Sequence, residues 1–231
     1  MNIKYFLPEG INALIRRIRS SKYRNRKIDH TYEETNHNRI SLITKGLFSI
    51  KSANPKYLEI GCFKNEVFNS IPLLSNQKIG VDPIEGGNIR KTSDDFFKVN
   101  DDFFDIVFID GLHTYDQIKK DILNSLKILN KNGIIFIHDM IPDSKISSLV
   151  QRQKYTSNWN GDVFRVIFDL LNNDNLSFKI ANIDYGVGIL KKKNENPIEF
   201  KPNNKDYKYF LSKKLNLPII SLEEAFEFIK G

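Results

Sequence analysis

The chain has 231 residues, of which 40% are hydrophobic and 27% are charged, and its formal net charge is +7. This length and composition are typical of one globular domain with room for appended helices. No apolar run reaches the roughly 18 residues that a transmembrane helix requires, and the N-terminus is not expected to be a signal peptide. The single cysteine, Cys62, excludes an internal disulfide framework and predicts a cytoplasmic location.

Much of the positive charge lies in residues 16–27 and in the run 191–193. We interpret such runs as solvated faces, and this interpretation is favoured over an anionic partner. Docking on an anionic membrane surface stays open without being favoured. Nucleic acid is not expected, because the chain carries no zinc-finger spacing, RNP-like aromatic motif or internal repeat.

Residues 1–50 are predicted to form an N-terminal helical extension. Apolar residues recur at helical spacing over 11–18, beside Arg16, Arg17 and Arg19, and again over 40–47. The polar residues 22–38 between them are expected to be irregular in part. These helices are expected to cap the core or to contact a second copy of the chain, so a homo-oligomer is one candidate assembly.

Residues 51–193 change to short apolar runs that alternate with amphipathic stretches. The predicted strands are 57–60, 78–82, 104–110, 133–139, 177–183 and 186–191, and the predicted helices are 67–71, 115–129 and 163–171. Continuous Ile, Val and Phe runs are typical of parallel strands that are covered on both faces. Because Asp184 and Tyr185 leave room only for a tight connection, the last two strands are expected to pair as an antiparallel hairpin.

The sequence therefore predicts an α/β fold with a doubly wound, mostly parallel sheet and an antiparallel C-terminal hairpin. Residues 194–231 are expected to be a tail of the same domain, with a polar loop and a short helix over 222–229.

Acidic residues follow the predicted strands at the edge where doubly wound sheets bind ligands. Glu59 and Gly61 stand at the end of the first strand, Asp82 at the second, and Asp110 and Asp139 at two later ones. Each alone could be a turn or a helix cap, but together they indicate a ligand site. The glycine lets the backbone approach a ligand closely, and a carboxylate such as Asp82 can accept both hydroxyls of a ribose.

Six motifs carry a resemblance to a known family: YLEIGC, IGVDP, TSDDFF, FDIVFIDGLHTYDQIKKDI, GIIFIHDM and WNGDVF. Over residues 56–191 the chain resembles bacterial class I methyltransferases of the macrocin and mycinamicin O-methyltransferase type. The resemblance implies a seven-stranded Rossmann-like sheet and S-adenosylmethionine as the methyl donor. It implies that six residues contact the donor: Glu59 and Gly61 at the methionine moiety, Asp82 at the ribose, Ser93 and Asp94 at the adenine, and Asp110. After Gly61 the later glycines of the common loop are missing, which argues against a dinucleotide fingerprint.

The chemistry predicted for this rim is deprotonation of an acceptor hydroxyl. Asp110 and Asp139, on neighbouring strand ends, could hold a hard divalent cation such as Mg²⁺, which would lower the pKa of a bound sugar hydroxyl. His113 has an ordinary pKa that suits a general base, and this is the role that the resemblance implies for a histidine of the DGxH pattern. The expected acceptor is a sugar hydroxyl of a glycan or of a glycosylated small molecule.

The other histidines and the residues near Trp159 receive weaker assignments. His138 could be a metal ligand or could orient a neighbour, but packing or orienting is the favoured interpretation, because adjacent strand residues point to opposite faces. His30 and His37 are expected at the surface. Trp159, Asn160 and Asp162 follow a long loop and are assigned to the acceptor pocket, although Asp162 could instead cap the next helix.

Three other functions stay open at this stage. A methyltransferase could act without metal and use Asp110 and His113 only for positioning. A nucleotide-binding oxidoreductase has the same fold but a different glycine pattern. A non-catalytic binding or scaffold protein would have no use for a base such as His113 beside Asp110.

Overall fold

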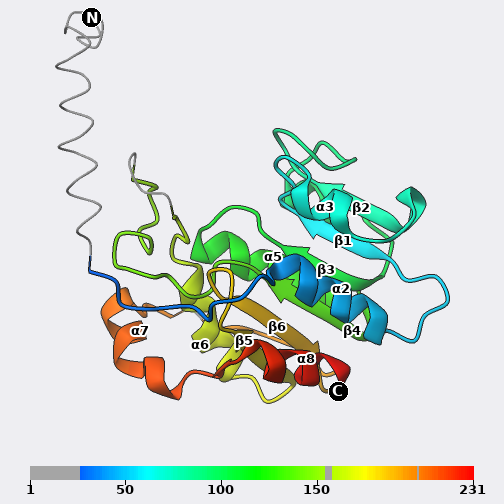
Figure 1. Cartoon of the computed structure of the whole chain (residues 1–231). Helices are drawn as coiled ribbons and strands as arrows, with labels where there is room; N and C mark the ends of the chain where they lie inside the picture. The colour runs from blue at the N-terminus through cyan, green and yellow to red at the C-terminus, as the bar shows by residue number, and fades with distance from the viewer. Residues whose placement is uncertain (1–26, 154–157, 202) are drawn as a thin grey trace, which may run out of the picture.

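The computed structural model describes residues 27–153, 158–201 and 203–231, and it contains one seven-stranded sheet with helices on both faces (Figure 1). In chain order the strands are β1 (Tyr57–Ile60), β2 (Lys78–Val81), β3 (Phe104–Ile109), β4 (Leu129–Ile137), β5 (Leu176–Ala181), β6 (Val187–Lys192) and β7 (Ile219–Ile220). Their order across the sheet is β2-β1-β3-β4-β6-β5-β7. The first four strands are mutually parallel, β6 is antiparallel to β4 and β5, and β7 is parallel to β5. The predicted doubly wound fold with an antiparallel hairpin is confirmed.

The helices alternate with the strands along the chain. The α-helices are α2 (Arg39–Ser49), α3 (Glu66–Ser70), α4 (Ser93–Phe97), α5 (Tyr115–Lys127), α6 (Ile167–Leu171), α7 (Tyr207–Lys213) and α8 (Leu222–Lys230), and the short 3₁₀ helices are η2 (Ser75–Gln77), η3 (Val163–Val166) and η4 (Lys214–Asn216). α2 packs beside α8 on one face of the sheet, as Figure 1 shows, and α5 packs on the other face beside η3. In the part of the chain that the structure describes, no helix combines the length and apolarity needed to cross a membrane.

The strand β3 divides the hydrophobic core into two layers. Ile106 and Phe108 pack with apolar residues of α2 and α8, whereas Val107 and Ile109 pack with those of α5. All six residues of β3 are buried, because side chains alternate between two covered faces. This burial explains the continuous apolar sequence of the strand and fixes its last residue, Ile109, beside the ligand edge.

The sheet reverses its winding direction between β1 and β3. Crevices at such reversal points, beyond the carboxyl ends of the strands, are the usual ligand sites of doubly wound sheets. Gly61 lies there with φ +85°, and a Cβ at this position would stand 2.3 Å from the carbonyl oxygen of Asp110. Only a glycine permits this conformation and this contact, so the first strand end lies directly against the third.

Apart from the short 3₁₀ helices η2 and η4, three elements were not predicted. α4 is a short helix formed by the polar motif TSDDFF. α7 and β7 lie in the tail, for which a polar loop and one helix were expected. Although the tail is mostly polar, its residues Phe210 and Leu217 are buried in the same hydrophobic cluster as residues of β3. β4 also begins four residues earlier than expected, because Leu129 pairs with Phe104 ahead of a register shift, after which the pairing resumes at Ile134.

The extension before α2 is only partly described. The predicted helix over 11–18 and the basic residues Arg16, Arg17 and Arg19 lie outside the described residues. Residues 27–38 contain no helix or strand, as expected, and cross the ligand edge of the sheet through backbone bonds from Asp29 to Asp143 and from Glu33 to Asn182.

The expectation that His30 lies at the surface is wrong. Its ring is buried with Nε2 2.6 Å from Asn182 Oδ1, and this burial lowers the pKa of His30. Backbone hydrogen bonds from His30 to Asp143 and from Glu33 to Asn182 hold the ring against the loop between β5 and β6. His37, by contrast, is exposed as expected.

Candidate active site

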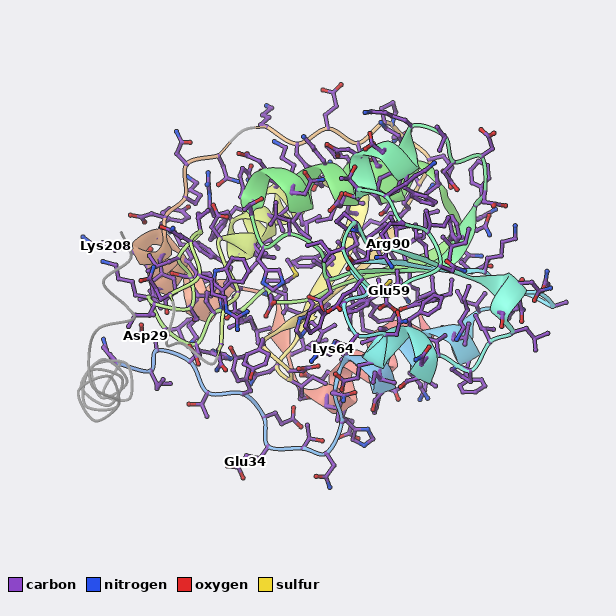
Figure 2. All side chains as sticks on the ribbon, turned by 90° about the horizontal axis from the view of Figure 1, so that it is seen from above. Asp29, Glu34, Glu59, Lys64, Arg90 and Lys208 are labelled. Atoms are coloured by element: carbon purple, nitrogen blue, oxygen red, sulfur yellow. The ribbon has the colours of Figure 1, made fainter. Side chains whose placement is uncertain are left out.

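A cavity of about 880 Å³ opens at the carboxyl ends of β1, β2, β3 and β4. Its volume is within the ~300–1,000 Å³ typical of small-molecule sites. Glu59 and Lys64, both labelled in Figure 2, belong to its lining. So do all the residues predicted to bind the cofactor or a metal or to act in catalysis: Glu59, Gly61, Asp82, Ser93, Asp94, Asp110, His113 and Asp139.

Glu59 is, with Asp121, one of the two most buried acidic residues of this cavity. Its side chain is 1% exposed, and its Oε2 accepts a hydrogen bond of 2.5 Å from the Tyr57 hydroxyl. Burial raises the pKa of Glu59 to about 7 in spite of that bond. The carboxyl group can therefore take up or release a proton near neutral pH.

Asp82 joins the loops that follow β1 and β2. One carboxylate oxygen accepts backbone N–H bonds from Cys62 and Phe63, and the other accepts from Ile84 and Glu85. Although burial opposes ionisation, these four bonds lower the pKa of Asp82. The carboxylate already has four donors, which is its usual capacity, so ribose hydroxyls would have to share or displace them.

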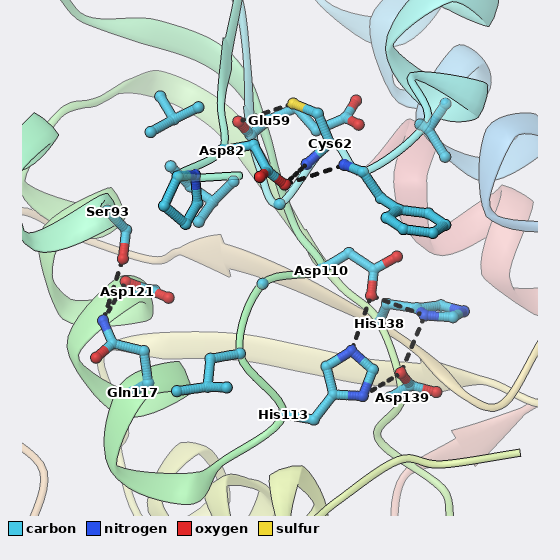
Figure 3. Close-up of a pocket in the computed structure, with 18 of the residues that line it drawn as sticks. Glu59, Cys62, Asp82, Ser93, Asp110, His113, Gln117, Asp121, His138 and Asp139 are labelled. Atoms are coloured by element: carbon cyan, nitrogen blue, oxygen red, sulfur yellow. Dashed lines mark hydrogen bonds and ion pairs between the residues drawn. The ribbon is translucent and has the colours of Figure 1, made fainter. Parts of the chain in front are cut away.

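Beyond Asp82, the wall of the cavity is formed by polar side chains of α4 and α5 that are hydrogen-bonded to one another. Thr92 caps α4 by accepting from Asp95 N, which places Ser93 and Asp94 at the rim. Gln117 of α5 donates to Ser93 Oγ, Asp94 Oδ1 and Asp121 Oδ1 at 3.0–3.1 Å (Figure 3). Burial raises the pKa of Asp121 to about 6. Gln117 and Asp121 were not predicted, because both stand within an ordinary amphipathic helix.

Two carboxylates and two imidazoles gather on the opposite side, as Figure 3 shows. His138 Nδ1 is 3.2 Å from Asp110 Oδ1 and 3.4 Å from Asp139 Oδ2. His113 Nε2 is 3.5 Å from the same Asp110 oxygen, and its Nδ1 is 3.1 Å from the same Asp139 oxygen. Ligand atoms of Asp110, His113 and Asp139 all lie within 4.8 Å of one another, a spacing that can hold a metal ion.

The charges of this cluster stabilise one another. Burial opposes ionisation of Asp110, but the charge of His138 and hydrogen bonds from both imidazoles hold the pKa of Asp110 well below its usual range. Burial also disfavours charged imidazoles, yet the carboxylates Asp110 and Asp139 raise the pKa of His113 and, more strongly, that of His138. The two imidazoles, when protonated, and the carboxylate of Asp110 therefore stabilise one another.

The expectation that the His138 side chain points away from Asp139 is wrong. β4 ends at Ile137, and the next residues leave the regular pleat. Asp139 adopts φ +60°, which is rare for a residue other than glycine. The strand alternation that separated His138 from Asp139 no longer applies there, and both side chains face the cluster.

The segment WNGD holds the cluster in place rather than only lining a pocket. The Trp159 carbonyl accepts from His113 Nδ1 at 2.8 Å, and its indole stacks on the His113 ring with centroids 4.7 Å apart. Asn160 Nδ2 donates to Asp139 Oδ1 at 2.9 Å. Gly161 passes so close to His113 that a Cβ would stand 1.8 Å from the His113 carbonyl oxygen. Trp159 itself lines the cavity.

Asp162 stands at the N-cap position of η3, as the sequence suggested, but not as a side-chain cap. Its side chain makes no cap hydrogen bond to η3. Instead Asp162 Oδ1 accepts from the backbone N–H of Tyr115 at 2.7 Å, at the start of α5. The carboxylate therefore stabilises a helix 47 residues away in sequence, which the local pattern could not indicate.

Arg39 and Asp184 complete the site and were not predicted. Arg39, the first residue of α2, donates through Nη1 to both oxygens of Asp184 at 3.0 and 2.9 Å. Asp184 lies in the connection between β5 and β6 with φ +46°, and its Oδ1 is 3.5 Å from His138 Nε2. The sequence marked Asp184 only as a turn residue, because its partners come from α2 and β4.

Comparisons with known proteins agree with this geometry. The sequence model of a family described as a methyltransferase domain matches residues 80–140, a segment that contains Asp82, Asp110, His113 and Asp139. A search of curated proteins finds no match to the chain.

Solved structures with the same fold are similar to this chain at low sequence identity. A Staphylococcus aureus protein provisionally described as a caffeoyl-CoA O-methyltransferase is 18% identical with a TM-score of 0.50, over 70% of this chain and 86% of that one. A Klebsiella pneumoniae protein provisionally described as an O-methyltransferase is 12% identical with a TM-score of 0.51, over 82% and 93%. The O-methyltransferase TomG of Streptomyces achromogenes, in complex with S-adenosylmethionine, is 11% identical with a TM-score of 0.50, over 68% and 82%.

The sheet order and the cavity at its reversal point are those of the class I methyltransferase fold, and residues 80–140 match the model of a methyltransferase domain. Both findings agree with the class inferred from the sequence motifs.

The raised pKa of Glu59 leads to a prediction about stability. Between its ordinary pKa of 4.5 and its folded value of about 7, the folded state binds more protons than the unfolded state, so stability falls as pH rises through this range. This loss amounts to about 3 kcal/mol at most. Glu59→Gln removes it and can still accept from Tyr57.

We expect the difference in melting temperature between Glu59→Gln and the wild type to grow by roughly 5–10 °C from pH 5 to pH 8. Thermal melts across this range measure it, and Glu34→Gln, at an exposed carboxylate, is the matched control. A difference that is independent of pH would contradict the prediction.

Gly161 supplies a second prediction. Its φ of +62° and the clash of any Cβ with the His113 carbonyl mean that Gly161→Ala must move the His113 loop away from Trp159. We expect a lower melting temperature and a changed emission of Trp159, the single tryptophan of the chain, because a protonated imidazole quenches a stacked indole.

Steady-state fluorescence of the folded protein measures the change. The control is Gly231→Ala, where nothing lies within 4 Å of the added Cβ. If Gly161→Ala retains the wild-type emission and stability, this contact does not hold His113 in place.

Proposed function

We propose that the protein transfers the methyl group of S-adenosylmethionine to a sugar hydroxyl of a glycan or of a glycosylated small molecule, assisted by a divalent metal ion. The observation that carries this proposal is the cluster of Asp110, His113 and Asp139 within 4.8 Å of one another. Carboxylates and a positioned imidazole are the groups needed to activate a hydroxyl, whereas donor binding alone has no use for them.

The donor would occupy the cavity from Glu59 to Gln117. Glu59 and Gly61 would contact the methionine moiety, and Asp82 would contact the ribose or hold the two loops around it. The adenine would lie against Ser93 and Asp94, which Gln117 fixes by hydrogen bonds. The rim residue Asp110 would then face the sulfonium end.

The cation would be held by Asp110 and Asp139, and Mg²⁺ fits their carboxylate oxygens. Asn160 occupies the other oxygen of Asp139 at 2.9 Å, which leaves Oδ2 directed at the cluster. A bound divalent cation supplies Lewis acidity that lowers the pKa of an acceptor hydroxyl. The cation would also neutralise the carboxylates in place of protonated imidazoles.

His113 would accept the hydroxyl proton. Its Nδ1–H donates to the Trp159 carbonyl at 2.8 Å, so a neutral ring has its lone pair on Nε2. As the acceptor oxygen forms its bond to the methyl carbon, the carbon–sulfur bond breaks, and its electron pair stays on sulfur. The products are the methyl ether, S-adenosylhomocysteine and a protonated His113, which releases its proton to solvent.

The acceptor side is bordered by Trp159 and Tyr185, whose aromatic faces can pack against the apolar face of a sugar ring. This border, together with the motifs shared with sugar O-methyltransferases, favours a glycosylated acceptor. The free, buried Cys62 agrees with a reducing compartment such as the cytoplasm.

The first prediction from this proposal concerns donor binding. S-adenosylhomocysteine should raise the melting temperature by mass action, and Asp82→Ala should remove most of this shift, because both loops around the donor lose their common acceptor. Differential scanning fluorimetry with S-adenosylhomocysteine and NAD measures it. Asp102→Ala, at a surface carboxylate paired with Lys56, is the control. A full shift in Asp82→Ala, or a shift with NAD alone, would refute the donor assignment.

The second prediction concerns the acceptor side. His113→Ala should leave the S-adenosylhomocysteine shift nearly intact but lower turnover by ~10²–10⁴-fold, the usual contribution of a positioned base. Chelation should suppress turnover and added divalent metal should restore it, whereas Asp139→Ala should resist this rescue.

The assay is transfer of labelled methyl to a panel of glycosylated acceptors, with His37→Ala as the matched control at an exposed histidine. Activity that ignores chelation but needs His113 would identify a metal-independent methyltransferase. Indifference to both treatments would refute the whole acceptor-side assignment.

A further inference from the structure

Arg39 is the least exposed lysine or arginine among the described residues that line the cavity. Its side chain is 20% exposed, whereas Lys64 and Arg152, the other two, are exposed. Its Nε lies 4.0 Å from Asp110 Oδ2. Burial raises the pKa of Glu59, and the charge of Arg39 opposes that rise. The guanidinium therefore lies close to the acidic groups at the ends of β1 and β3.

One edge of the Arg39 side chain is fixed by Asp184. Arg39 Nη1 donates to both oxygens of this carboxylate at 3.0 and 2.9 Å, and the backbone N of Arg39 donates to Oδ2 at 2.9 Å. Asp184 itself has φ +46°, and such strained conformations occur preferentially at functional sites. The guanidinium is thus held in one orientation before any ligand binds.

The other edge of the guanidinium has no hydrogen-bond partner among the described residues. Nε is buried and makes no hydrogen bond, because 4.0 Å to Asp110 Oδ2 is too long for one. The hydrogen bonds of Arg39 use its backbone N and Nη1, so Nη2 has no partner there either. Nε–H and one Nη2–H form the fork that binds a carboxylate through two hydrogen bonds. Since buried donors are nearly always paired, the open fork indicates an anionic group of a ligand.

The charges around the fork favour a zwitterion over a simple anion. The carboxylates of Asp110, Asp184 and Glu66 all act electrostatically on the guanidinium, and Glu59 lines the same cavity. A ligand with negative charge alone would be repelled by these groups. The methionine moiety of the donor has an ammonium and a carboxylate on one carbon atom, so the acidic groups can attract the ammonium while the fork binds the carboxylate.

We infer that Arg39 binds the carboxylate of the donor's methionine moiety through Nε and Nη2. Asp184 is then a positioning residue that acts through Arg39. This inference rests on the donor assignment of the proposed function. It adds a residue of α2, which lies outside both the strand ends and the matched segment 80–140.

The test compares two ligands that differ in one group. S-adenosylhomocysteine has the carboxylate, and its decarboxylated analogue keeps the ammonium, the thioether and the adenosine. Isothermal titration of the full chain gives the ratio of the two affinities. From the wild type to Arg39→Gln this ratio should fall by ~10–100-fold in disfavour of S-adenosylhomocysteine, the usual effect of losing a charge-assisted contact.

Two further variants separate the contact from other effects of the substitution. Arg39→Lys keeps the positive charge without the fork, so its ratio should also fall, by several-fold. Lys45→Gln removes a charge elsewhere on α2, over the ring of Phe226, and should leave the ratio unchanged. Should Arg39→Gln fail to fold, judged by its melt, Arg39→Lys replaces it in the comparison.

Two outcomes of the titration would overturn the inference. If Arg39 only supports the structure, Arg39→Gln weakens both ligands equally and the ratio stays at its wild-type value. If the ratio falls in Arg39→Gln but not in Arg39→Lys, the positive charge acts at a distance and the fork makes no contact.

Arginine side-chain spectra give a direct measurement of the contact. In ¹H–¹⁵N spectra of the full chain labelled at arginine, the Nε–H signal of Arg39 is the one that Arg39→Lys removes. S-adenosylhomocysteine should move this signal to lower field, because the hydrogen then donates to a carboxylate, and the decarboxylated analogue should leave it near its ligand-free position. A signal that moves equally with both ligands would refute the contact.

The outcomes separate this inference from the proposed function. If S-adenosylhomocysteine binds the wild type and the ratio is the same in every variant, the donor assignment stands and Arg39 does not bind the carboxylate. If neither ligand binds the wild type, the donor assignment and this inference fail together.

Discussion

The arrangement of this protein depends on one constraint: Asp110 and Asp139 are held together in a site with little solvent. Two ionised carboxylates in such a place repel each other and lose hydration, so each needs cations and hydrogen-bond donors in contact with it. His113 and His138 provide the cations, at 3.1–3.5 Å from the carboxylate oxygens. Asn160 provides a further donor to Asp139. The surrounding segments are arranged to keep these partners in place.

The supporting segments come from distant parts of the chain, and several adopt costly backbone conformations. Asp139, Asp184 and Tyr185 have positive φ without being glycine. Two backbone bonds hold this region together, from Met140 N to the Gly186 carbonyl and from Ile141 N to the Tyr185 carbonyl. These bonds tie the end of β4 to the hairpin between β5 and β6. The antiparallel hairpin therefore does more than close the sheet, because it fixes the conformation in which Asp139 and His138 face the same cluster.

The sequence predicted the fold and the acidic residues better than it predicted their supports. Period and composition identify the strands, since β1, β3 and the second half of β4 are buried on both faces and consist mainly of apolar residues. Acids at strand ends then fall together, because parallel strands end at one edge. The supports follow no local rule: Arg39 begins a helix, Asp184 lies in a turn, and His138 is directed inward only because Asp139 leaves the pleat. His30 was misplaced for a related reason, since backbone bonds of an irregular segment bury it.

The backbone of the loop after β1 is in direct contact with the backbone of the loop after β3. This contact would have a consequence for methyl transfer. Methyl transfer requires the sulfonium carbon and the acceptor oxygen to be aligned closely, and a misplacement of about 1 Å can cost ~10²-fold in rate. Flexible side chains alone would hold such an alignment poorly. Here Gly61, on the loop after β1, lies where a single Cβ would stand 2.3 Å from the Asp110 carbonyl and 2.6 Å from the Gly111 Cα. Asp110 N also donates to the Ile60 carbonyl at 2.8 Å. The loop that would position the donor and the residue that would position the acceptor are therefore joined by adjoining β-strands, and neither can shift without the other.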